Sequence, residues 1–213
     1  MYEAILFDLD GTLTDPKEGI TKSVQYALEK SGIKPPPKEE LLDFIGPPLF
    51  DSFCELFHMP PEEAHQAVAY YRERFSVTGL YENKVFDGVP RLLEQLKKSG
   101  KIIALATAKP HVYARKILEH YHLIDWFDLL VGAEFDGTRG HKTEVIEEAL
   151  RQLPEGISAI MVGDRRQDIL GAKACGIPSI GVRFGYAEPG ELETAGADLI
   201  VDSIPELLEV LLR

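Results

Sequence analysis

The chain has 213 residues, of which 45% are hydrophobic and 27% charged, and its formal net charge is -12. The length and composition fit a globular protein with one large domain, or one domain that carries a smaller inserted one. The acidic balance argues against a nucleic-acid polymer or an anionic membrane surface as partner, because both attract clustered basic residues. A small anionic substrate is still compatible, provided that local cations or a metal ion lie in its site.

The sequence carries no mark of export or membrane insertion. Its first residues lack the basic region and apolar run of a signal peptide, and no apolar run approaches the length of a membrane span. Cys54 and Cys175 stand outside any CxxC or metal-ligand spacing, so we expect small core residues rather than ligands. We therefore expect a cytoplasmic protein.

The first predicted element is a strand over Ala4–Phe7, whose four residues are all apolar. A continuous apolar run of this length is typical of a strand buried on both faces of a parallel sheet. Two carboxylates, Asp8 and Asp10, come after it, and then the turn residue Gly11. Like charges at the end of a buried strand repel each other, so this arrangement needs a positive partner.

From residue 15 to residue 79 every predicted element is a helix. The stretches EGITKSVQYALEKSG, EELLDFIG, LFDSFCELFH and PEEAHQAVAYYRERF have helical spacing of apolar residues, with no strand candidate between them. We predict an all-helical subdomain of residues 15–79, inserted into a core of residues 1–14 and 80–213. The expected hinges are residues 14–17 and 78–87.

One loop of the predicted insertion is a candidate for the surface that faces the substrate. It runs over residues 44–50, FIGPPLF, where Gly46 allows close approach of the backbone and the two prolines stiffen the end of the loop. A simple turn between two helices explains the same residues equally well.

After the insertion, strand patterns alternate with helical patterns. The helical stretches include those that end at Gly100 and Leu153, and the strand candidates are residues 102–106, 129–132, 159–163, 178–182 and 198–201. Such alternation requires crossover connections and so a mainly parallel sheet. The predicted fold class is α/β: a Rossmann-like parallel sheet core flanked by helices, with the all-helical cap subdomain inserted after the first strand.

The polar residues that come after these strands are expected to share one edge of the sheet, because ligands of open parallel sheets bind beyond the carboxyl ends of the strands. They are Asp8, Asp10, Thr107, Lys142, Asp164 and Asp168. Each has an ordinary explanation alone, as a turn residue, a helix cap or a solvated lysine. Their common position after strands favours a functional site.

This set of side chains suits phosphoryl transfer. Asp8 and Asp164, with Asp10 and Asp168, can share a hard divalent cation such as magnesium. Thr107, the adjacent Ala108 and Lys142 can bind a phosphoryl group. Asp8 can attack phosphorus and form an aspartyl phosphate, while Asp10 can protonate the leaving oxygen and later deprotonate water.

Four motifs carry a resemblance to a known family: FDLDGTLTD, Thr107 in LATAKP, Lys142 in GHKTEVI, and VGDRRQD with Asp164 and Asp168. In these motifs, and over nearly its whole length, the chain resembles the haloacid dehalogenase superfamily, in its phosphatase branch near the phosphoglycolate phosphatases. The first and fourth motifs are specific, and the second and third are specific by position.

The resemblance implies Asp8 as nucleophile, Asp10 as acid and base, and magnesium ligands from Asp8, the Asp10 carbonyl and Asp164. It also implies that the helical insertion is a mobile cap. Thr143 comes after Lys142 where phosphoglycolate-type members usually have proline, and Arg165 comes after Asp164 where they often have a small hydroxyl residue. These two departures bear on the substrate rather than on the chemistry.

We therefore expect a magnesium-dependent phosphatase that hydrolyses small phosphomonoesters through an aspartyl phosphate, similar to phosphoglycolate phosphatases or to 5′-nucleotidases. The expected partner is a small phosphorylated metabolite: 2-phosphoglycolate, a nucleoside 5′-monophosphate or a small sugar phosphate. The sequence indicates no oligomeric state.

Three other functions share part of this pattern. A phosphosugar mutase of the same superfamily would use the same residues, and the sequence leaves it open. A phospho-acceptor receiver carries its acceptor on a middle strand and has no helical insertion after the first strand. A dehalogenase lacks the acid two residues after the nucleophile, where this chain has Asp10.

Overall fold

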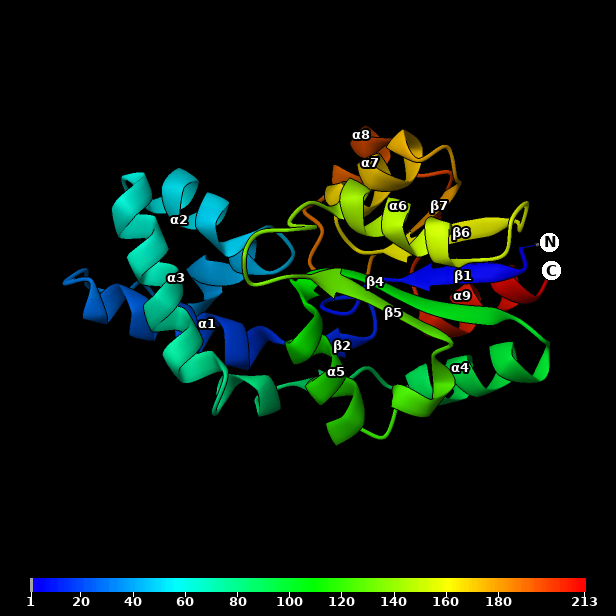
Figure 1. The fold of residues 1–213 in the computed structure, drawn as a ribbon, viewed down its shortest axis with the longest axis horizontal. Helices are drawn as coiled ribbons and strands as arrows, with labels where there is room; N and C mark the ends of the chain where they lie inside the picture. The colour runs from blue at the N-terminus through cyan, green and yellow to red at the C-terminus, as the bar shows by residue number, and fades with distance from the viewer. Residues whose placement is uncertain (1) are drawn as a thin grey trace. The chain divides into compact units, whose positions relative to one another are not determined.

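The structure, a computed structural model, describes residues 2–213 (Figure 1). Contacts among these residues divide the chain into two compact units. The first, the sheet unit, contains the chain up to Asp15 together with Val85–Arg213. The second, the helical unit, is Pro16–Lys84.

A parallel sheet is the centre of the sheet unit. Within residues 2–213 it has six strands in the order β5-β4-β1-β6-β7-β8. Each neighbouring pair is parallel. The strands are β1 (Ala4–Phe7), β4 (Ile102–Pro110), β5 (Leu129–Ala133), β6 (Ala159–Gly163), β7 (Ser179–Val182) and β8 (Leu199–Val201). The predicted fold class is confirmed, and each predicted strand exists to within a few residues at its ends.

Helices cover both faces of this sheet (Figure 1). One face carries α6 (Lys142–Gln152), α7 (Arg166–Ala174) and α8 (Glu191–Ala195). The other carries α4 (Val89–Lys98), α5 (His111–His120) and α9 (Ile204–Leu212), and a short 3-10 helix, η3 (Ile124–Trp126), precedes β5.

The first strand is buried on both faces, as its continuous apolar sequence predicts. Ala4 and Leu6 pack in a cluster with Val145 and Ile146 of α6, and all four residues of β1 are fully buried. Burying apolar side chains on both faces stabilises the strand that bears the first two acids, by about 25 cal/mol per Å² of area removed from water.

The register of the strands brings their carboxyl ends into line. Phe7 of β1 lies opposite Leu105 of β4 and Val162 of β6. The next residue, Asp8, donates its backbone N–H to the Val162 carbonyl over 2.9 Å. Thr107 comes two residues after Leu105, and Asp164 two residues after Val162. Asp8, Thr107 and Asp164 therefore share one edge of the sheet.

The fourth strand differs from its prediction. It does not end at residue 106 but continues to Pro110, with a break in register after Thr107. Thr107 lies opposite Gly132 of β5, while Pro110 lies opposite the very next residue, Ala133. The extra residues of β4, Ala108 and Lys109, therefore form a bulge, which lets the strand continue through a sequence that lacks a strand pattern.

The helical unit contains α1 (Lys17–Lys30), η1 (Lys38–Phe44), α2 (Leu49–Phe57), α3 (Pro61–Phe75) and η2 (Gly79–Tyr81). The predicted helix in the stretch EELLDFIG is a 3-10 helix, η1, with bonds such as that from Ile45 N–H to the Leu42 carbonyl, 2.9 Å. Short helical pieces often take this tighter form. Where the chain passes between the units, β2 (Thr14–Asp15) and β3 (Lys84–Val85) pair as a small second sheet.

Gly46 forms the turn between η1 and α2. Its φ angle is 109°, a left-handed conformation that residues with a Cβ rarely adopt. The neighbouring Phe44 and Ile45 are buried, and the ring of Phe44 meets the ring of Phe53 edge-on with centroids 5.0 Å apart. The turn alone thus requires a glycine here, whatever else the loop does.

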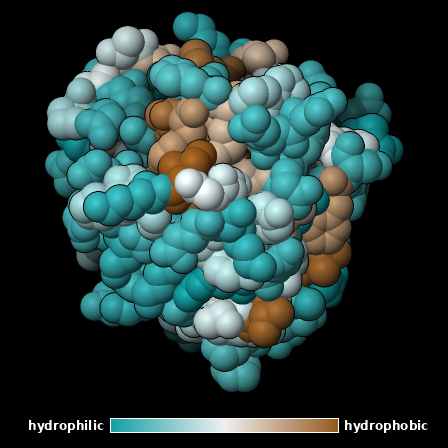
Figure 2. Space-filling view, turned by 90° about the vertical axis from the view of Figure 1, so that its left-hand side faces the viewer, coloured by the Kyte–Doolittle hydropathy of each residue, from teal (hydrophilic) through white to brown (hydrophobic). Residues whose placement is uncertain are grey.

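Hydrophilic residues dominate the face of the protein shown in Figure 2, where apolar residues are confined to smaller patches. Along residues 2–213, none of the helices combines the length and apolar character that crossing a lipid bilayer requires. Both cysteines are free and only partly buried, so the expectation that they are core residues is met in part.

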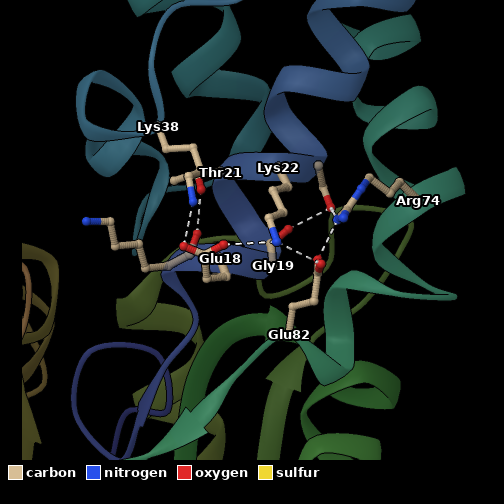
Figure 3. A network of polar contacts seen from close by, with 9 residues as sticks. Glu18, Gly19, Thr21, Lys22, Lys38, Arg74 and Glu82 are labelled. Carbon is tan, nitrogen blue, oxygen red and sulfur yellow. Dashed lines mark hydrogen bonds and ion pairs between the residues drawn. The ribbon is translucent and has the colours of Figure 1, made fainter.

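A network of charged side chains joins separate parts of the helical unit (Figure 3). Lys22 of α1 lies 3.0 Å from Glu18 and 3.1 Å from Glu82, which comes directly after η2. Arg74 of α3 lies 2.7 Å from Glu82, and Lys38 of η1 lies 2.6 Å from Glu18. Ion pairs of this kind are worth little singly, but a connected set fixes the first helix against the end of the unit.

The network lowers the pKa values of its carboxylates. The hydrogen bond from Arg74 is the main cause for Glu82, whose pKa lies below its usual value. Bonds from Lys38 and Lys22 lower the pKa of Glu18 to about 2. A carboxylate with a lowered pKa in the folded state stabilises the fold above its unfolded pKa, and this stability is lost as the pH falls through the folded pKa.

We predict that Glu82→Gln lowers the free energy of unfolding by about 1 kcal/mol at pH 7, because Arg74 and Lys22 lose their charged partner. The deficit should shrink as the pH falls below the usual pKa of a glutamate and through the lowered pKa of the folded Glu82, where its carboxylate becomes protonated. Urea unfolding at each pH measures this. Glu209→Gln on α9, which removes an exposed pair with Arg213, is the control and should change little. A deficit that is the same at both ends of the pH range contradicts the prediction.

Candidate active site

Three carboxylates meet at the carboxyl edge of the sheet. Asp8 comes directly after β1, Asp164 directly after β6, and Asp168 lies in the first turn of α7. Each offers an oxygen, and the three oxygens lie within 4.8 Å of one another. All three residues are buried, with Asp164 fully inaccessible.

Lys142 supplies a positive charge to this group. It is the first residue of α6, and its Nζ lies 2.7 Å from Asp8 Oδ1 and 2.8 Å from Asp168 Oδ1. It also donates a hydrogen bond of 3.1 Å to the Ala106 carbonyl of β4. Burial acts to lower the pKa of Lys142, but the charges of Asp168 and Asp8 outweigh it and raise the pKa, so the ammonium stays charged.

One ammonium does not balance the acids around it. Burial, and then the charges of Asp168 and Asp8, raise the pKa of Asp164 well above its usual value. Burial also raises the pKa of Asp168 to about 6, although Lys142 opposes the change. Burial is the main cause of both shifts, and repulsion from the neighbouring carboxylates adds to it.

The three carboxylates fit a hard divalent cation. The donor set is made only of oxygens, the type of ligand that magnesium and calcium take. A bound cation would offset the negative charges of Asp168 and Asp8, which add to burial in raising the pKa of Asp164. The carboxylate of Asp10 is not part of this group of three.

The space around Asp164 is filled by backbone. A Cβ added at Gly11, whose φ is 82°, would lie 2.0 Å from Asp164 Oδ2, and one at Gly185 would lie 2.4 Å from the same atom. The Tyr186 N–H donates to Asp164 Oδ2 over 2.8 Å, and the Thr12 hydroxyl donates to Oδ1 over 3.3 Å. The two glycines therefore let the loops approach closely enough to hold this carboxylate in one orientation.

Thr12, Gly185 and Tyr186 are site residues that the sequence did not reveal. Thr12 lies inside the first motif, and its place two residues after Asp10 was a signal that could have indicated it. Tyr186 lies in the loop after β7, where the sequence has no such signal, because a loop conformation decides where its N–H points. Its hydroxyl also donates to Asp15, and burial together with this contact raises the pKa of Tyr186.

Thr107 and Ala108 lie at the same edge of the sheet, on β4. Thr107 is 2% exposed, and its Oγ1 accepts a hydrogen bond of 3.3 Å from the Lys109 N–H. Lys142 reaches the carbonyl of the preceding residue, Ala106, so the hydroxyl and the ammonium belong to adjoining parts of the edge. Gly46 belongs to the helical unit, where it forms the turn described above.

Asp10 has a cation of its own, which the sequence did not indicate. Lys109 Nζ lies 2.5 Å from Asp10 Oδ2, and the two side chains are 6% and 9% exposed. Burial raises the pKa of Asp10, while the Lys109 charge lowers it in part.

Arg165 is one of the two departures from the phosphoglycolate-type pattern, and its side chain forms an ion pair with Glu191. Its Nε lies 3.0 Å from Glu191 of α8, and both side chains are less than 10% exposed. Its backbone N–H donates to Asp168 Oδ2 over 3.0 Å. Arg165 therefore ties α8 to the start of α7 and supports Asp168.

Comparison with known proteins agrees with this geometry. Residues 5–182 match the family described as haloacid dehalogenase-like hydrolase. A 5′-nucleotidase of Pseudomonas aeruginosa is 50% identical over 194 residues, which are 90% of this chain and 87% of the relative. A crystal structure described as a predicted phosphatase from Clostridium acetobutylicum has a TM-score of 0.96 and 46% identity, and covers 100% of this chain and 99% of that one.

Two further relatives carry different names. The tyrosine-protein kinase PtkA of Mycobacterium tuberculosis is 36% identical over 214 residues, 98% of this chain and 72% of the relative. A phosphoglycolate phosphatase of Cupriavidus necator is 33% identical over 209 residues, 96% of this chain and 90% of the relative.

An α/β fold whose sheet has an acidic edge, in a chain with relatives named as phosphatases, defines a hydrolase of the phosphatase type. The chain belongs to the haloacid dehalogenase-like hydrolase family. The resemblance seen in the four motifs is thereby confirmed, including its relation to phosphoglycolate phosphatases, and so is the predicted class of enzyme.

We predict that magnesium stabilises the protein through Asp164. At a concentration 100 times its dissociation constant, the ion should add about 2.7 kcal/mol to the free energy of unfolding. Asp164→Asn should abolish this gain, because it removes a carboxylate while its amide can still bond to Tyr186 N–H and to Thr12. In excess EDTA the variant should be at least as stable as the unchanged protein, since one source of repulsion is gone.

Thermal or urea unfolding with and without magnesium measures both effects. A variant that magnesium stabilises as much as it does the unchanged protein would show that Asp164 is not a ligand.

Proposed function

We propose that this phosphatase hydrolyses small phosphomonoesters in a magnesium-dependent reaction, through an aspartyl phosphate on Asp8. The observation that carries the proposal is the position of Lys142, which a buried Asp8 and a buried Asp168 hold between them at 2.7 and 2.8 Å. An ammonium fixed beside a carboxylate at a sheet edge can bind the phosphoryl group that the carboxylate attacks.

Each residue has a distinct part in the proposed reaction. Asp8 attacks phosphorus, and its bond to phosphorus forms as the bond to the leaving oxygen breaks. Lys142 and the Thr107 hydroxyl bind the oxygens of the phosphoryl group, with Ala108 beside them. Asp10 gives a proton to the leaving oxygen, and then takes one from the water that hydrolyses the aspartyl phosphate.

Asp8, Asp164 and Asp168, with the carbonyl of Asp10, are the proposed magnesium site. Bound there, the ion would supply positive charge close to the phosphoryl oxygens. Tyr186 N–H and Thr12 orient Asp164 for this role, and Lys142 and Arg165 N–H orient Asp168.

A nucleoside 5′-monophosphate is the first substrate to test, and 2-phosphoglycolate and small sugar phosphates come next. The order rests on the names of the relatives: the 5′-nucleotidase is 50% identical and the phosphoglycolate phosphatase 33%. Rates per unit concentration over a panel of phosphate esters with magnesium test it.

We propose further that the helical unit is a cap that excludes water from Asp8 and limits which leaving group fits. Its residues come from an insertion between β1 and β4, and the chain enters and leaves it next to the short strands β2 and β3. The loop of residues 44–50 is the proposed surface toward the leaving group.

We predict that Asp8→Asn lowers turnover roughly a thousandfold or more without unfolding the protein. The amide is close in shape but is a poor nucleophile and a weaker ligand. Steady-state rates test this, with excess EDTA on the unchanged protein as a second condition that should also abolish activity. Activity of the variant within tenfold of the unchanged protein would contradict the nucleophile assignment.

We predict that a bulky residue at Gly46 impairs a large ester more than acetyl phosphate. Any side chain strains the backbone at a φ of 109°, so the comparison that matters is between Gly46→Ala and Gly46→Phe. Phenylalanine should lower kcat/KM for a nucleotide roughly tenfold more than for acetyl phosphate, and alanine should not discriminate. Equal losses for both substrates would mean that this loop does not face the leaving group.

A further inference from the structure

Lys109 owes its position to the bulge in β4. Thr107 and Pro110 lie opposite two successive residues of β5, so Ala108 and Lys109 are extra residues that the sheet does not pair. A bulge beside an active site commonly turns a side chain away from the direction that the pleat would give it. Here the turned side chain ends at Asp10, with Nζ 2.5 Å from Oδ2.

The neighbouring strand makes room for this bulge. A Cβ added at Gly132 of β5 would lie 2.8 Å from the Lys109 carbonyl oxygen and 2.9 Å from the backbone of His111. The Lys109 N–H also donates to Thr107 Oγ1. The backbone at Lys109 is thus held by the close approach of Gly132 and by the hydrogen bond to Thr107. A lysine on a solvated surface requires neither contact.

The two oxygens of Asp10 have different surroundings. Oδ2 is held by Lys109, in a pair whose side chains are 6% and 9% exposed. Oδ1 is buried and has no hydrogen-bond partner among residues 2–213. A buried carboxylate oxygen without a partner costs stability, so the arrangement calls for a role for Oδ1.

We propose that Lys109 is a positioning residue for the proton transfer to the leaving group: it fixes Oδ2 of Asp10 and so keeps Oδ1 directed toward the leaving oxygen. This inference rests on the proposed function, in which Asp10 is the acid. The proton moves from Oδ1 to the leaving oxygen as the bond from that oxygen to phosphorus breaks and the bond from Asp8 forms. Lys109 keeps its own proton throughout.

The proposal differs from a role in substrate binding. A lysine that binds the substrate would change KM, and would act alike on esters with good and poor leaving groups. A lysine that acts through Asp10 changes the first chemical step only where the leaving oxygen needs a proton. The ratio kcat/KM reports that step alone, and is independent of the later hydrolysis of the aspartyl phosphate.

The test compares Lys109→Met with the unchanged protein on p-nitrophenyl phosphate and on an alkyl phosphate, with saturating magnesium. We expect kcat/KM to fall roughly a hundredfold for the alkyl ester and less than about threefold for the nitrophenyl ester. Lys109→Arg, which keeps the cation, should recover most of the loss. Lys101→Met is the matched control, because Lys101 is also buried but donates to the Tyr2 carbonyl, away from the acids.

A double variant separates a positioning role from a general structural one. If Lys109 acts through Asp10, adding Lys109→Met to Asp10→Asn causes no further loss on the alkyl ester. Equal losses on both esters, or a further loss in the double variant, overturn the proposal. If Lys109→Met does not fold, Lys109→Gln is measured in the same way.

Failure of the proposed function is distinguishable from failure of this inference. If Asp8→Asn remains active, the reaction itself is wrong. If Asp8→Asn is inactive on both esters while the Lys109 variants lose activity without regard to the leaving group, only the role of Lys109 is wrong.

Discussion

Repulsion among buried carboxylates is the constraint on which the rest of the structure depends. Asp8, Asp164 and Asp168 place oxygens within 4.8 Å of one another, at a sheet edge with little access to water. Lys142 is the one cation that touches two of them among the described residues. Burial, and then the charges of Asp168 and Asp8, raise the pKa of Asp164. A site with several buried carboxylates and one shared ammonium is suited to bind further positive charge.

The surrounding chain is built to hold these acids in place. Gly11 and Gly185 let two loops pack directly against Asp164, and hydrogen bonds from Tyr186, Thr12 and the start of α7 fix the carboxylates. Lys109 gives Asp10 a separate partner. The same edge thus separates two kinds of acid: a group of three with Lys142 beside it, and a single acid paired to its own lysine.

The sequence predicted most of this edge because position after a strand obeys simple rules of parallel sheets. Asp8, Thr107 and Asp164 could be placed together once the strands were recognised. The contacts of Lys109 and Tyr186 could not be predicted, because a bulge decides where the first points and a loop conformation where the second points. Neither a bulge nor a loop produces a periodic pattern of residues in the sequence. For a similar reason η1 was predicted as a helix but not as a 3-10 helix, since the spacing of its apolar residues does not separate the two forms over so few turns.

Trapping the covalent intermediate tests the central claim most directly. The protein is mixed with a phosphate ester and magnesium, quenched during turnover and reduced with borohydride, which converts a phosphorylated aspartate to homoserine. Mass spectrometry of the peptide that contains residues 5–15 should then show homoserine at position 8 and unchanged aspartate at position 10. Homoserine at position 10, or a phosphoryl group on any other residue in place of Asp8, would contradict the account.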